Sequence, residues 1–270
     1  MINDVHGKYE ELKQILKQMD SVAVAYSGGV DSTFLLKAAK EALGERVMAI
    51  TMKIHSFPME EYDSCIEFCN KEQILHRTLT INELDIPGFS DNPPNRCYIC
   101  KKALFSTMQK FAKTQGYVTL VEGSNTDDDG DYRPGLQAIK ELGVRSPLKQ
   151  AGLTKKDIRL LSKELELPTW DKPSLACLST RFPYGENITE EKLSMVGEGE
   201  RFLHHHGIIQ ARVRCHGCLA RIEIMPEDFD RIMIDDFRKE LVTKFKAIGF
   251  SYVSLDLQGY RTGSMNENLK

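Results

Sequence analysis

The chain has 270 residues, of which 41% are hydrophobic and 28% charged, enough for one large core or two smaller ones. Its 39 acidic and 36 basic residues leave a formal net charge of only −3, which argues against a general surface for nucleic acids or other polyanions. No apolar run reaches the ~18 residues that a membrane span requires, so we expect no membrane partner.

The first 20 residues are polar and have the pattern of an amphipathic helix. Tyr9, Leu12, Leu16 and Met19 fall on one face of that helix. A secretory signal would instead carry a central apolar region. We therefore expect no signal peptide and a cytoplasmic location.

Strands and helices are then predicted to alternate. Strands are expected at residues 21–26, 47–54, 78–81 and 117–122, and helices at 33–43, around 62–69, at 101–113 and at 135–142. This alternation predicts an α/β fold in which helices cover both faces of a parallel sheet.

The second part of the chain is expected to form a smaller α/β domain. Residues 154–157 resemble a capping box that opens a helix over 157–165. Residues 171–185 have no clear periodicity, and we place the domain boundary there, with domains at 1–172 and 173–270. The second domain should contain a helix at 190–206, strands at 212–215 and 220–225, a helix pair, and a strand at 252–257.

The sequence SGGVDS, at residues 27–32, lies directly between a predicted strand and a predicted helix. Gly28 and Gly29 allow the backbone to approach an anion closely, and the amides at the start of a helix can bind a pyrophosphate. Ser27 and Ser32 offer hydroxyl donors, while Asp31 can hold Mg²⁺ or cap the helix. An ordinary glycine turn is the alternative, but six residues in this order at this place argue against it.

This loop is neither a Walker A motif nor a GxGxxG motif. It resembles the loop of the PP-loop ATP pyrophosphatases, and the resemblance implies cleavage of ATP between its α- and β-phosphates with adenylation of a substrate oxygen. Residues 122–127 (EGSNTD) end another predicted strand, where open α/β sheets bind ligands. The expected ATP contacts are Ser27, Gly28, Gly29, Val30, Asp31, Ser32, Met52, Gly123, Asn125, Asp127 and Arg133, with Mg²⁺ on Asp31. For the acidic residues 127–131, a solvated loop remains an alternative.

Several further segments share one resemblance. They are RCYICKKALF at 96–105, DYRPG at 131–135, VRSPL at 144–148, KPSLACLSTRFPYG at 172–185, RVRCHG at 212–217 and ARIEI at 220–224. Together they resemble the LarE family of ATP-dependent sulfur transferases over residues 9–234. The resemblance implies a nicotinate-derived substrate, pyridinium-3,5-biscarboxylic acid mononucleotide, whose carboxylates are adenylated and converted to thiocarboxylates. The product would serve the nickel-pincer nucleotide cofactor, and residues 173–270 would form the sulfur-transfer and substrate-binding domain.

The chemistry requires a sulfur atom beside the adenylate. Cys177 lies in the non-periodic segment near Arg181, and a neighbouring cation favours a reactive thiolate. We therefore expect Cys177, Asp31 and Arg181 to be catalytic.

The seven cysteines are not expected to form a disulfide framework in a cytosolic chain. Members of the resembled family either sacrifice one cysteine, which becomes dehydroalanine, or hold a [4Fe-4S] cluster on three cysteines. Cys97, Cys100 and Cys177 match the three-cysteine form, in which an open iron can bind hydrosulfide from a sulfide donor. The sacrificial role of Cys177 remains an alternative, as does a zinc site that includes Cys215 and Cys218. Cys65 and Cys69 are expected in the core.

Arginine side chains are the expected partners of the anionic substrate, because a guanidinium binds a carboxylate or phosphate through two parallel hydrogen bonds. Arg181, Arg212 and Arg214 are the candidates, and Arg212 and Arg214 share one face of a strand. Glu200 and Asp230 are expected to orient them or the substrate. Lys101 is an additional candidate for the ATP phosphates. We also expect a homo-oligomer.

Two other classes of function remain open. A different PP-loop enzyme, such as a tRNA thiolase or an amidating synthetase, would use the same loop, although the charge balance argues against RNA binding. A regulatory module would bind ATP without releasing pyrophosphate.

Overall fold

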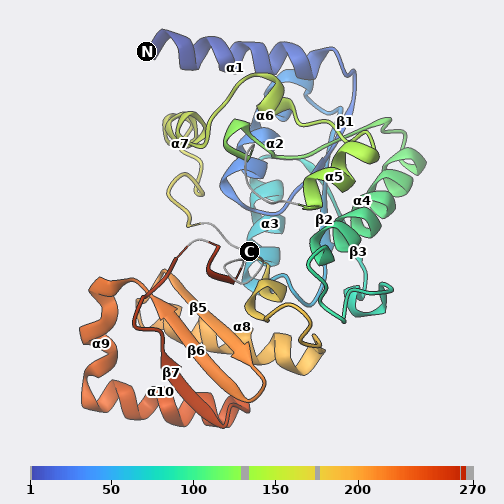
Figure 1. The fold of residues 1–270 in the computed structure, drawn as a ribbon. Helices are drawn as coiled ribbons and strands as arrows, with labels where there is room; N and C mark the ends of the chain where they lie inside the picture. The colour runs from blue at the N-terminus through green and yellow to red at the C-terminus, as the bar shows by residue number, and fades with distance from the viewer. Residues whose placement is uncertain (1, 129–133, 174–176, 262, 266–270) are drawn as a thin grey trace. The chain divides into compact units, whose positions relative to one another are not determined.

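A computed structural model describes the chain except for residues 1, 129–133, 174–176, 262 and 266–270. The chain divides into two compact units (Figure 1). The first contains Met1–Asn82 and Cys97–Leu175, and the second contains Glu83–Arg96 and Ala176–Lys270. Residues 83–96 thus belong to the second unit although the first unit surrounds them in the sequence. No helix in the described residues is long and apolar enough to cross a membrane.

A four-stranded parallel sheet forms the centre of the first unit. Its strands are β1 (Val22–Ala25), β2 (Val47–Lys53), β3 (Leu75–Thr80) and β4 (Thr119–Val121), in the order β3-β2-β1-β4. The chain moves outward from β1 through β2 to β3 and then returns to the other side of β1. The direction of connection therefore reverses between β1 and β4.

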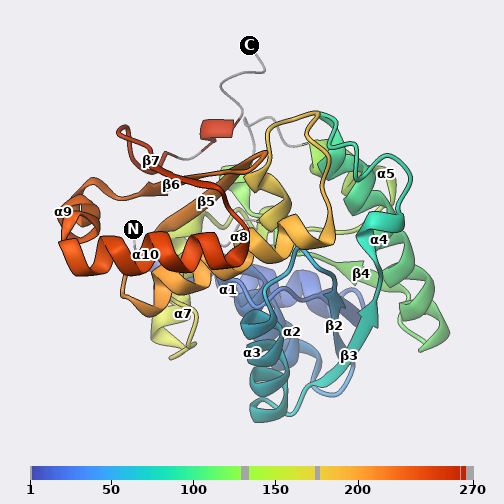
Figure 2. The same ribbon diagram turned by 90° about the horizontal axis from the view of Figure 1, so that it is seen from below.

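Helices pack on both faces of this sheet, which confirms the predicted α/β class (Figures 1 and 2). They are α1 (Ile2–Lys17), α2 (Val30–Leu43), α3 (Met59–Lys71), α4 (Arg96–Thr114), α5 (Pro134–Glu141), α6 (Pro147–Gln150) and α7 (Lys155–Glu164). Side chains from α1, α2, α3 and α7 fill one hydrophobic cluster, while α4 and α5 contribute to the other. Because successive strand residues face opposite sides, Val24 and Ala23 of β1 belong to different clusters.

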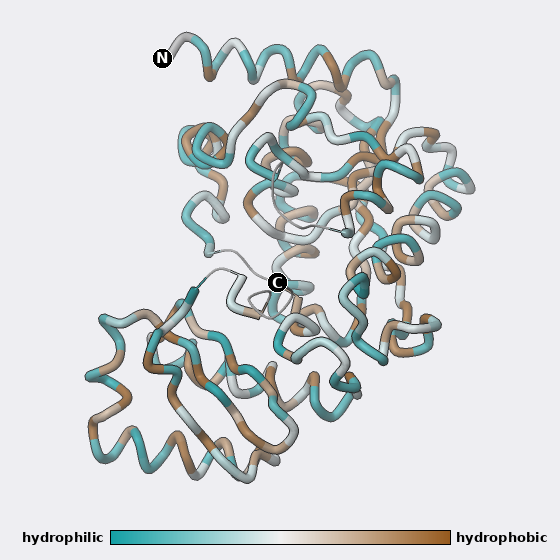
Figure 3. The backbone as a smooth tube through the Cα atoms, viewed as in Figure 1, coloured by the Kyte–Doolittle hydropathy of each residue, from teal (hydrophilic) through white to brown (hydrophobic). Residues whose placement is uncertain are grey.

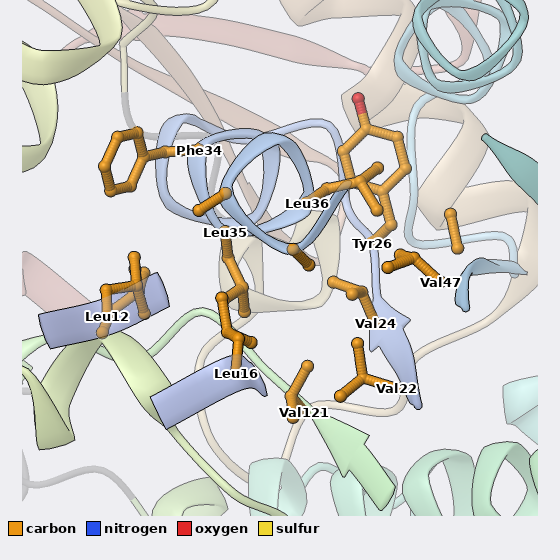
Figure 4. Close-up of a cluster of buried hydrophobic side chains, with 14 of the residues drawn as sticks. Leu12, Leu16, Val22, Val24, Tyr26, Phe34, Leu35, Leu36, Val47 and Val121 are labelled. Carbon is orange, nitrogen blue, oxygen red and sulfur yellow. The ribbon is translucent and has the colours of Figure 1, made fainter. Parts of the chain in front are cut away.

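The cluster between α1, α2 and β1 shows how the amphipathic sequence forms this core (Figure 4). Leu12 and Leu16 of α1 are fully buried, and Tyr9 packs on Phe34 of α2 with ring centroids 5.4 Å apart. Hydrophobic stretches interrupt the hydrophilic turns of α1 in Figure 3. Full burial of one leucine side chain stabilises the fold by about 1.5–3 kcal/mol.

The second unit contains a three-stranded sheet in the order β5-β6-β7. Its strands are β5 (Ala211–His216), β6 (Leu219–Ile224) and β7 (Tyr252–Leu255), and its helices are α8 (Glu190–His205), α9 (Phe229–Met233) and α10 (Asp235–Ile248). β5 and β6 are antiparallel, whereas β6 and β7 are parallel. Gly199 permits α8 to approach its neighbours, since a Cβ there would lie 3.1 Å from the Phe245 ring.

Hydrogen bonds join residues 83–96 to the rest of the second unit. The amide of Gly185 donates to Asn92 O at 2.9 Å, and the amide of Ile188 donates to Ser90 O at 2.9 Å. The Asn92 side chain donates to Pro183 O at 2.7 Å. This segment also includes a short 3₁₀ helix, η1 (Glu83–Asp85).

Two predicted boundaries differ from the structure in ways that matter for the site. The helix expected at 33–43 begins at Val30, so Asp31 and Ser32 lie in its first turn. The segment expected to be a loop over 171–185 contains a 3₁₀ helix, η3 (Leu178–Arg181), directly after Cys177.

Candidate functional site

The two segments expected to bind ATP follow neighbouring strands of the first sheet. The SGGVDS loop follows β1, and the EGSNTD segment begins after β4. A ligand crevice forms at such a point in an open parallel sheet, where connections diverge in opposite directions. The segments are close together, because a Cβ on Gly123 would lie 3.1 Å from Ser32 N.

Hydrogen bonds of the Ser32 side chain hold the glycine-rich loop in its turn. The Ser32 hydroxyl accepts from the Ser27 amide at 3.3 Å and donates to Gly29 O at 3.2 Å. Gly28 has φ = +66°, and a Cβ at this position would lie 2.8 Å from Cys65 Sγ. Glycine is therefore required at position 28 both for its conformation and for space.

The start of α2 is suited to an anion. Gly29 is its N-cap residue and provides no side-chain hydrogen bond to the first-turn amides. Such amides, together with the positive end of the helix dipole, attract phosphate groups. Val30 is buried at the first position of this helix and anchors the turn in the core.

The two carboxylate oxygens of Asp31 have different surroundings. Its Oδ2 accepts from Lys155 Nζ at 2.6 Å, whereas its buried Oδ1 has no hydrogen-bond partner among the described residues. Burial raises the pKa of the Asp31 carboxyl, and the Lys155 ammonium opposes that rise. Because Mg²⁺ prefers carboxylate oxygens, the Oδ1 atom fits the expected metal-binding role.

The loop after β4 is connected to the start of α7 by a series of hydrogen bonds. The Asp127 amide donates to Asn125 Oδ1 at 2.9 Å, and Asp127 Oδ2 accepts from the Lys155 amide at 2.8 Å. The Thr126 amide and hydroxyl each donate to Leu153 O at 3.0 Å. Asp127 thus holds the first residue of α7, and Asn125 in turn holds Asp127.

The remaining ATP candidates are distributed differently. Met52 is buried near the end of β2, in the cluster with side chains of α4 and α5. Lys101 lies over the start of α5, where a Cβ on Gly135 would be 2.6 Å from its Cδ. Arg133 lies outside the described residues, as does the last part of the acidic segment 127–131.

Arg181 and Glu200 form a buried ion pair in the second unit. Arg181 Nε and Nη2 donate to the two Glu200 oxygens at 2.5 and 2.9 Å, and Arg181 is only 2% exposed. The Val213 amide also donates to Glu200 Oε1 at 2.9 Å. Burial alone would raise the pKa of Glu200, but the charges and hydrogen bonds of the arginines hold it below its usual value.

The two arginines of β5 are also buried. Arg214 donates to Glu223 Oε2 at 2.7 Å, to Thr180 O at 3.0 Å and to Ser264 Oγ at 3.0 Å. Its buried Nε has no hydrogen-bond partner among the described residues. Arg212 packs over the Tyr260 ring, with its guanidinium carbon 5.3 Å from the centroid, and burial lowers its pKa.

The structure therefore groups most, but not all, of the expected substrate contacts. The charges of Arg181, Arg212 and Glu200 act on one another, and Arg214 reaches the backbone of η3 at Thr180. Asp230, by contrast, is exposed on α9 and makes no ion pair with these arginines in the described parts of the chain.

Cys177 is exposed at the start of η3. Its carbonyl oxygen accepts from the Thr180 amide at 2.9 Å and from the Thr180 hydroxyl at 2.8 Å. Arg181 Nη1 donates to that hydroxyl at 2.7 Å. Arg181 is thus linked to the Cys177 main chain through Thr180.

A buried arginine that carried no role in the sequence analysis supports the same turn. Arg96 donates to Ser179 O at 2.8 Å and also bonds the Asn92 side chain. The sequence signal for Arg96 is its place at the start of the RCYIC segment, but in the sequence analysis only the cysteines of that segment are assigned a role.

The other cysteines divide between exposed and core positions. Cys97 and Cys100 are half-buried near the start of α4 in the first unit, three residues apart and on one helix face. Cys65 and Cys69 are buried as predicted, and burial raises the pKa of both thiols to about 12. Cys215 is buried on β5 and Cys218 is exposed in the following turn. Within the described ranges, no three His, Cys, Asp or Glu residues form a metal-binding group.

Comparisons with known proteins identify relatives of this chain. No model of a protein family matches the chain. An uncharacterized protein of Synechocystis is 44% identical over 98% of this chain and 99% of its own length. The pyridinium-3,5-bisthiocarboxylic acid mononucleotide synthase of Lactiplantibacillus plantarum is 35% identical over 97% of this chain and 95% of its own length. One subunit of the glutamine-hydrolyzing GMP synthase of Methanococcus maripaludis is 27% identical over 70% of this chain and 65% of its own length.

Proposed function

The chain belongs to the LarE family of ATP-dependent sulfur transferases, and we propose that it adenylates pyridinium-3,5-biscarboxylic acid mononucleotide and converts its carboxylates to thiocarboxylates. Its first unit has the PP-loop ATP pyrophosphatase fold, which the GMP synthase relatives share. One observation carries the proposal. The SGGVDS loop and the loop after β4 meet at the sheet edge, and Asp31 there lies in the first turn of a helix without a side-chain cap. One Asp31 oxygen accepts from Lys155, and the other has no hydrogen-bond partner among the described residues.

The residues of this edge suit the handling of a pyrophosphate. The amides of the first turn of α2 donate toward an anion, and Gly28 lets the backbone approach it. Asp31 would hold Mg²⁺, which neutralises charge on the departing pyrophosphate when it is bound. A carboxylate is a poor electrophile, so adenylation provides the leaving group that its conversion requires.

The arginines of the second unit suit an anionic substrate. Arg181 and Arg214 are each held by a buried carboxylate, and their guanidinium groups are therefore fixed in place. The buried Arg214 Nε, without an acceptor in the described residues, fits a substrate carboxylate or phosphate. We assign Arg181, Arg212 and Arg214 to the anionic groups of the substrate and Glu200 to the orientation of Arg181.

The proposed sulfur carrier is a [4Fe-4S] cluster on Cys97, Cys100 and Cys177. Two observations support it: the helical spacing of Cys97 and Cys100 puts both thiols on one face, and the Cys177 side chain is exposed. Three thiolates leave one iron open, and such an iron can carry hydrosulfide when the cluster is bound. In the alternative chemistry, the Cys177 thiolate displaces AMP from the acyl adenylate. Loss of the Cα proton and cleavage of the Cβ–S bond then release the thiocarboxylate and leave dehydroalanine.

A pyrophosphate-release assay with the biscarboxylic nucleotide tests the proposal. We expect AMP and pyrophosphate in equal amounts, only when the nucleotide is present. Release of ADP and phosphate would contradict the reaction class. Pyrophosphate release that requires tRNA or ammonia instead would indicate another PP-loop enzyme, and ATP binding without release would indicate a regulatory module. The sulfide donor and the homo-oligomeric state remain predictions.

A further inference from the structure

Lys155 and Asp31 form an ion pair at the end of the glycine-rich loop. Lys155 is the first residue of α7, and its Nζ lies 2.6 Å from Asp31 Oδ2. Their side chains are 31% and 25% exposed, so the pair is partly shielded from solvent. Neither a motif nor the family resemblance assigns a role to Lys155.

Hydrogen bonds on both sides hold the backbone of Lys155 in place. Its amide donates to Asp127 Oδ2 at 2.8 Å. Thr154 and Asp157 form a complete capping box, and Asp157 also accepts from Lys8 Nζ at 3.0 Å. α7 in turn packs against α2, the helix that begins at the glycine-rich loop (Figure 1). The flexible four-carbon stem is therefore the part of Lys155 that can move.

An ammonium and a divalent cation are alternative partners of the same carboxylate, because both are positively charged and compete for its oxygens. Lys155 occupies Asp31 Oδ2, and Oδ1 has no partner in the described residues. A triphosphate placed on the amides of the first turn of α2 would put phosphate oxygens beside Asp31, which belongs to that same turn. The ammonium would then have an anionic acceptor within reach other than Asp31.

We propose that Lys155 is a phosphate-binding residue that neutralises Asp31 in the nucleotide-free protein and moves to the pyrophosphate part of ATP when Asp31 takes up Mg²⁺. This inference rests on the proposed function of the site. It assigns Asp127 and the capping box of α7 to the positioning of Lys155. No bond is made or broken in the exchange, since one cation replaces another at Asp31.

The exchange predicts effects of opposite sign from one substitution. In Lys155→Met, Asp31 loses its competing cation, so binding of Mn²⁺ alone should become tighter, by about tenfold for one charged contact. Binding of Mg²⁺–pyrophosphate should weaken by about 10- to 100-fold, because one charged hydrogen bond is lost. Mn²⁺ binding is read by electron paramagnetic resonance and pyrophosphate binding by calorimetry. Lys156→Met is the matched control, since Lys156 is the exposed next residue of the same helix, and both affinities should stay unchanged.

A second pair of variants tests the exchange without metal. In excess EDTA, Asp31→Asn should bind pyrophosphate more tightly than the natural protein, because the substitution releases Lys155 and removes a negative charge. Adding Lys155→Met should abolish most of that gain, and this coupling isolates the pair. Lys155→Arg should retain most of the pyrophosphate binding that Lys155→Met loses.

Two results would overturn the proposal. In the first, Lys155→Met leaves both affinities unchanged. In the second, it weakens Mn²⁺ and pyrophosphate together, which would make Lys155 only a structural support of Asp31. Failure of the proposed function is distinguishable, because a protein that does not turn over the biscarboxylic nucleotide can still show the opposite-sign pattern with Mn²⁺ and pyrophosphate.

Discussion

At the scale of single residues, Asp31 is the most informative position, because Lys155 binds one of its oxygens and the other has no hydrogen-bond partner among the described residues. Asp31→Ala should abolish pyrophosphate release, since the expected Mg²⁺ ligand is removed. The loss is measured as pyrophosphate formed per chain with saturating ATP and substrate. Asp63→Ala, an exposed aspartate on α3, is the control and should retain full activity.

Gly28 allows a test of the tight contact behind the loop. Gly28→Ala should weaken ATP binding and lower stability, because a Cβ would lie 2.8 Å from Cys65 Sγ and φ is +66°. The left-handed conformation alone costs roughly 1–2 kcal/mol. Gly116→Ala, also at positive φ but with open space around its Cβ, should show that cost alone. Adding Cys65→Ala to Gly28→Ala should recover part of the ATP affinity, and no recovery would refute the steric explanation.

Substitutions of the two arginines of β5 should have separable effects on substrate binding and on the free energy of unfolding. Arg212→Ala or Arg214→Ala should each remove about 1.5–3 kcal/mol of substrate binding, as expected for a charged hydrogen bond. Arg214→Ala should also lower the free energy of unfolding by about 3–5 kcal/mol, because Glu223 would remain buried beside one fewer cation. Calorimetric titration with the nucleotide and chemical denaturation measure the two effects. Unchanged substrate affinity with both arginines replaced would contradict their assignment.

At the scale of elements, the N-cap of α7 should matter for catalysis as well as for folding. Thr154→Ala removes the acceptor of the Asp157 amide, 3.1 Å away, and should cost about 0.5–2 kcal/mol of stability. It should also raise the KM for ATP, because Lys155 follows directly. Thr189→Ala removes the equivalent N-cap of α8, whose hydroxyl accepts from the Lys192 amide at 3.3 Å. That variant should lose similar stability and keep its KM for ATP; an equal rise in both would argue against a specific role of α7.

The elements show what periodicity can and cannot predict. β1 and β2 were predicted because they are apolar runs, and the helices because each has an apolar face. β3 (LHRTLT) is largely polar, and the prediction missed its first three residues. The glycine-rich loop was found because its chemistry lies within six consecutive residues. Lys155 was missed because its partner is 124 positions away. Arg96 was missed for the same reason, since it supports the turn of Ser179 from 83 positions away.

At the scale of the whole molecule, the proposed cluster can be tested through the iron content of the protein. Anaerobically reconstituted protein should contain about four irons per chain and show broad visible absorption. Replacement of Cys97, Cys100 or Cys177 by serine should abolish both. Cys65→Ser and Cys215→Ser are the controls and should retain the iron, because both thiols are buried with raised pKa values.

The mass of the chain after turnover distinguishes the two sulfur sources. With excess sulfide, a cluster-bearing enzyme should make many products per chain, and its mass should stay constant. If the chain instead becomes lighter by one H₂S for each product, Cys177 is the sacrificial donor and the cluster proposal is wrong.

The hydrogen bonds of the segment Glu83–Arg96 limit when this part of the nascent chain can fold. Its partners around residues 183–188 follow it by about 90 positions in the sequence. At ~5–20 residues per second, a ribosome delivers those partners roughly 5 to 18 s after Arg96 has been added. During that interval β4, the last strand of the first sheet, is synthesised, while Asn92 and Arg96 still lack their partners Pro183 and Ser179. The nascent chain therefore completes its first sheet before the partners of residues 83–96 exist, and this segment can form its native hydrogen bonds only after residues 183–188 have been added.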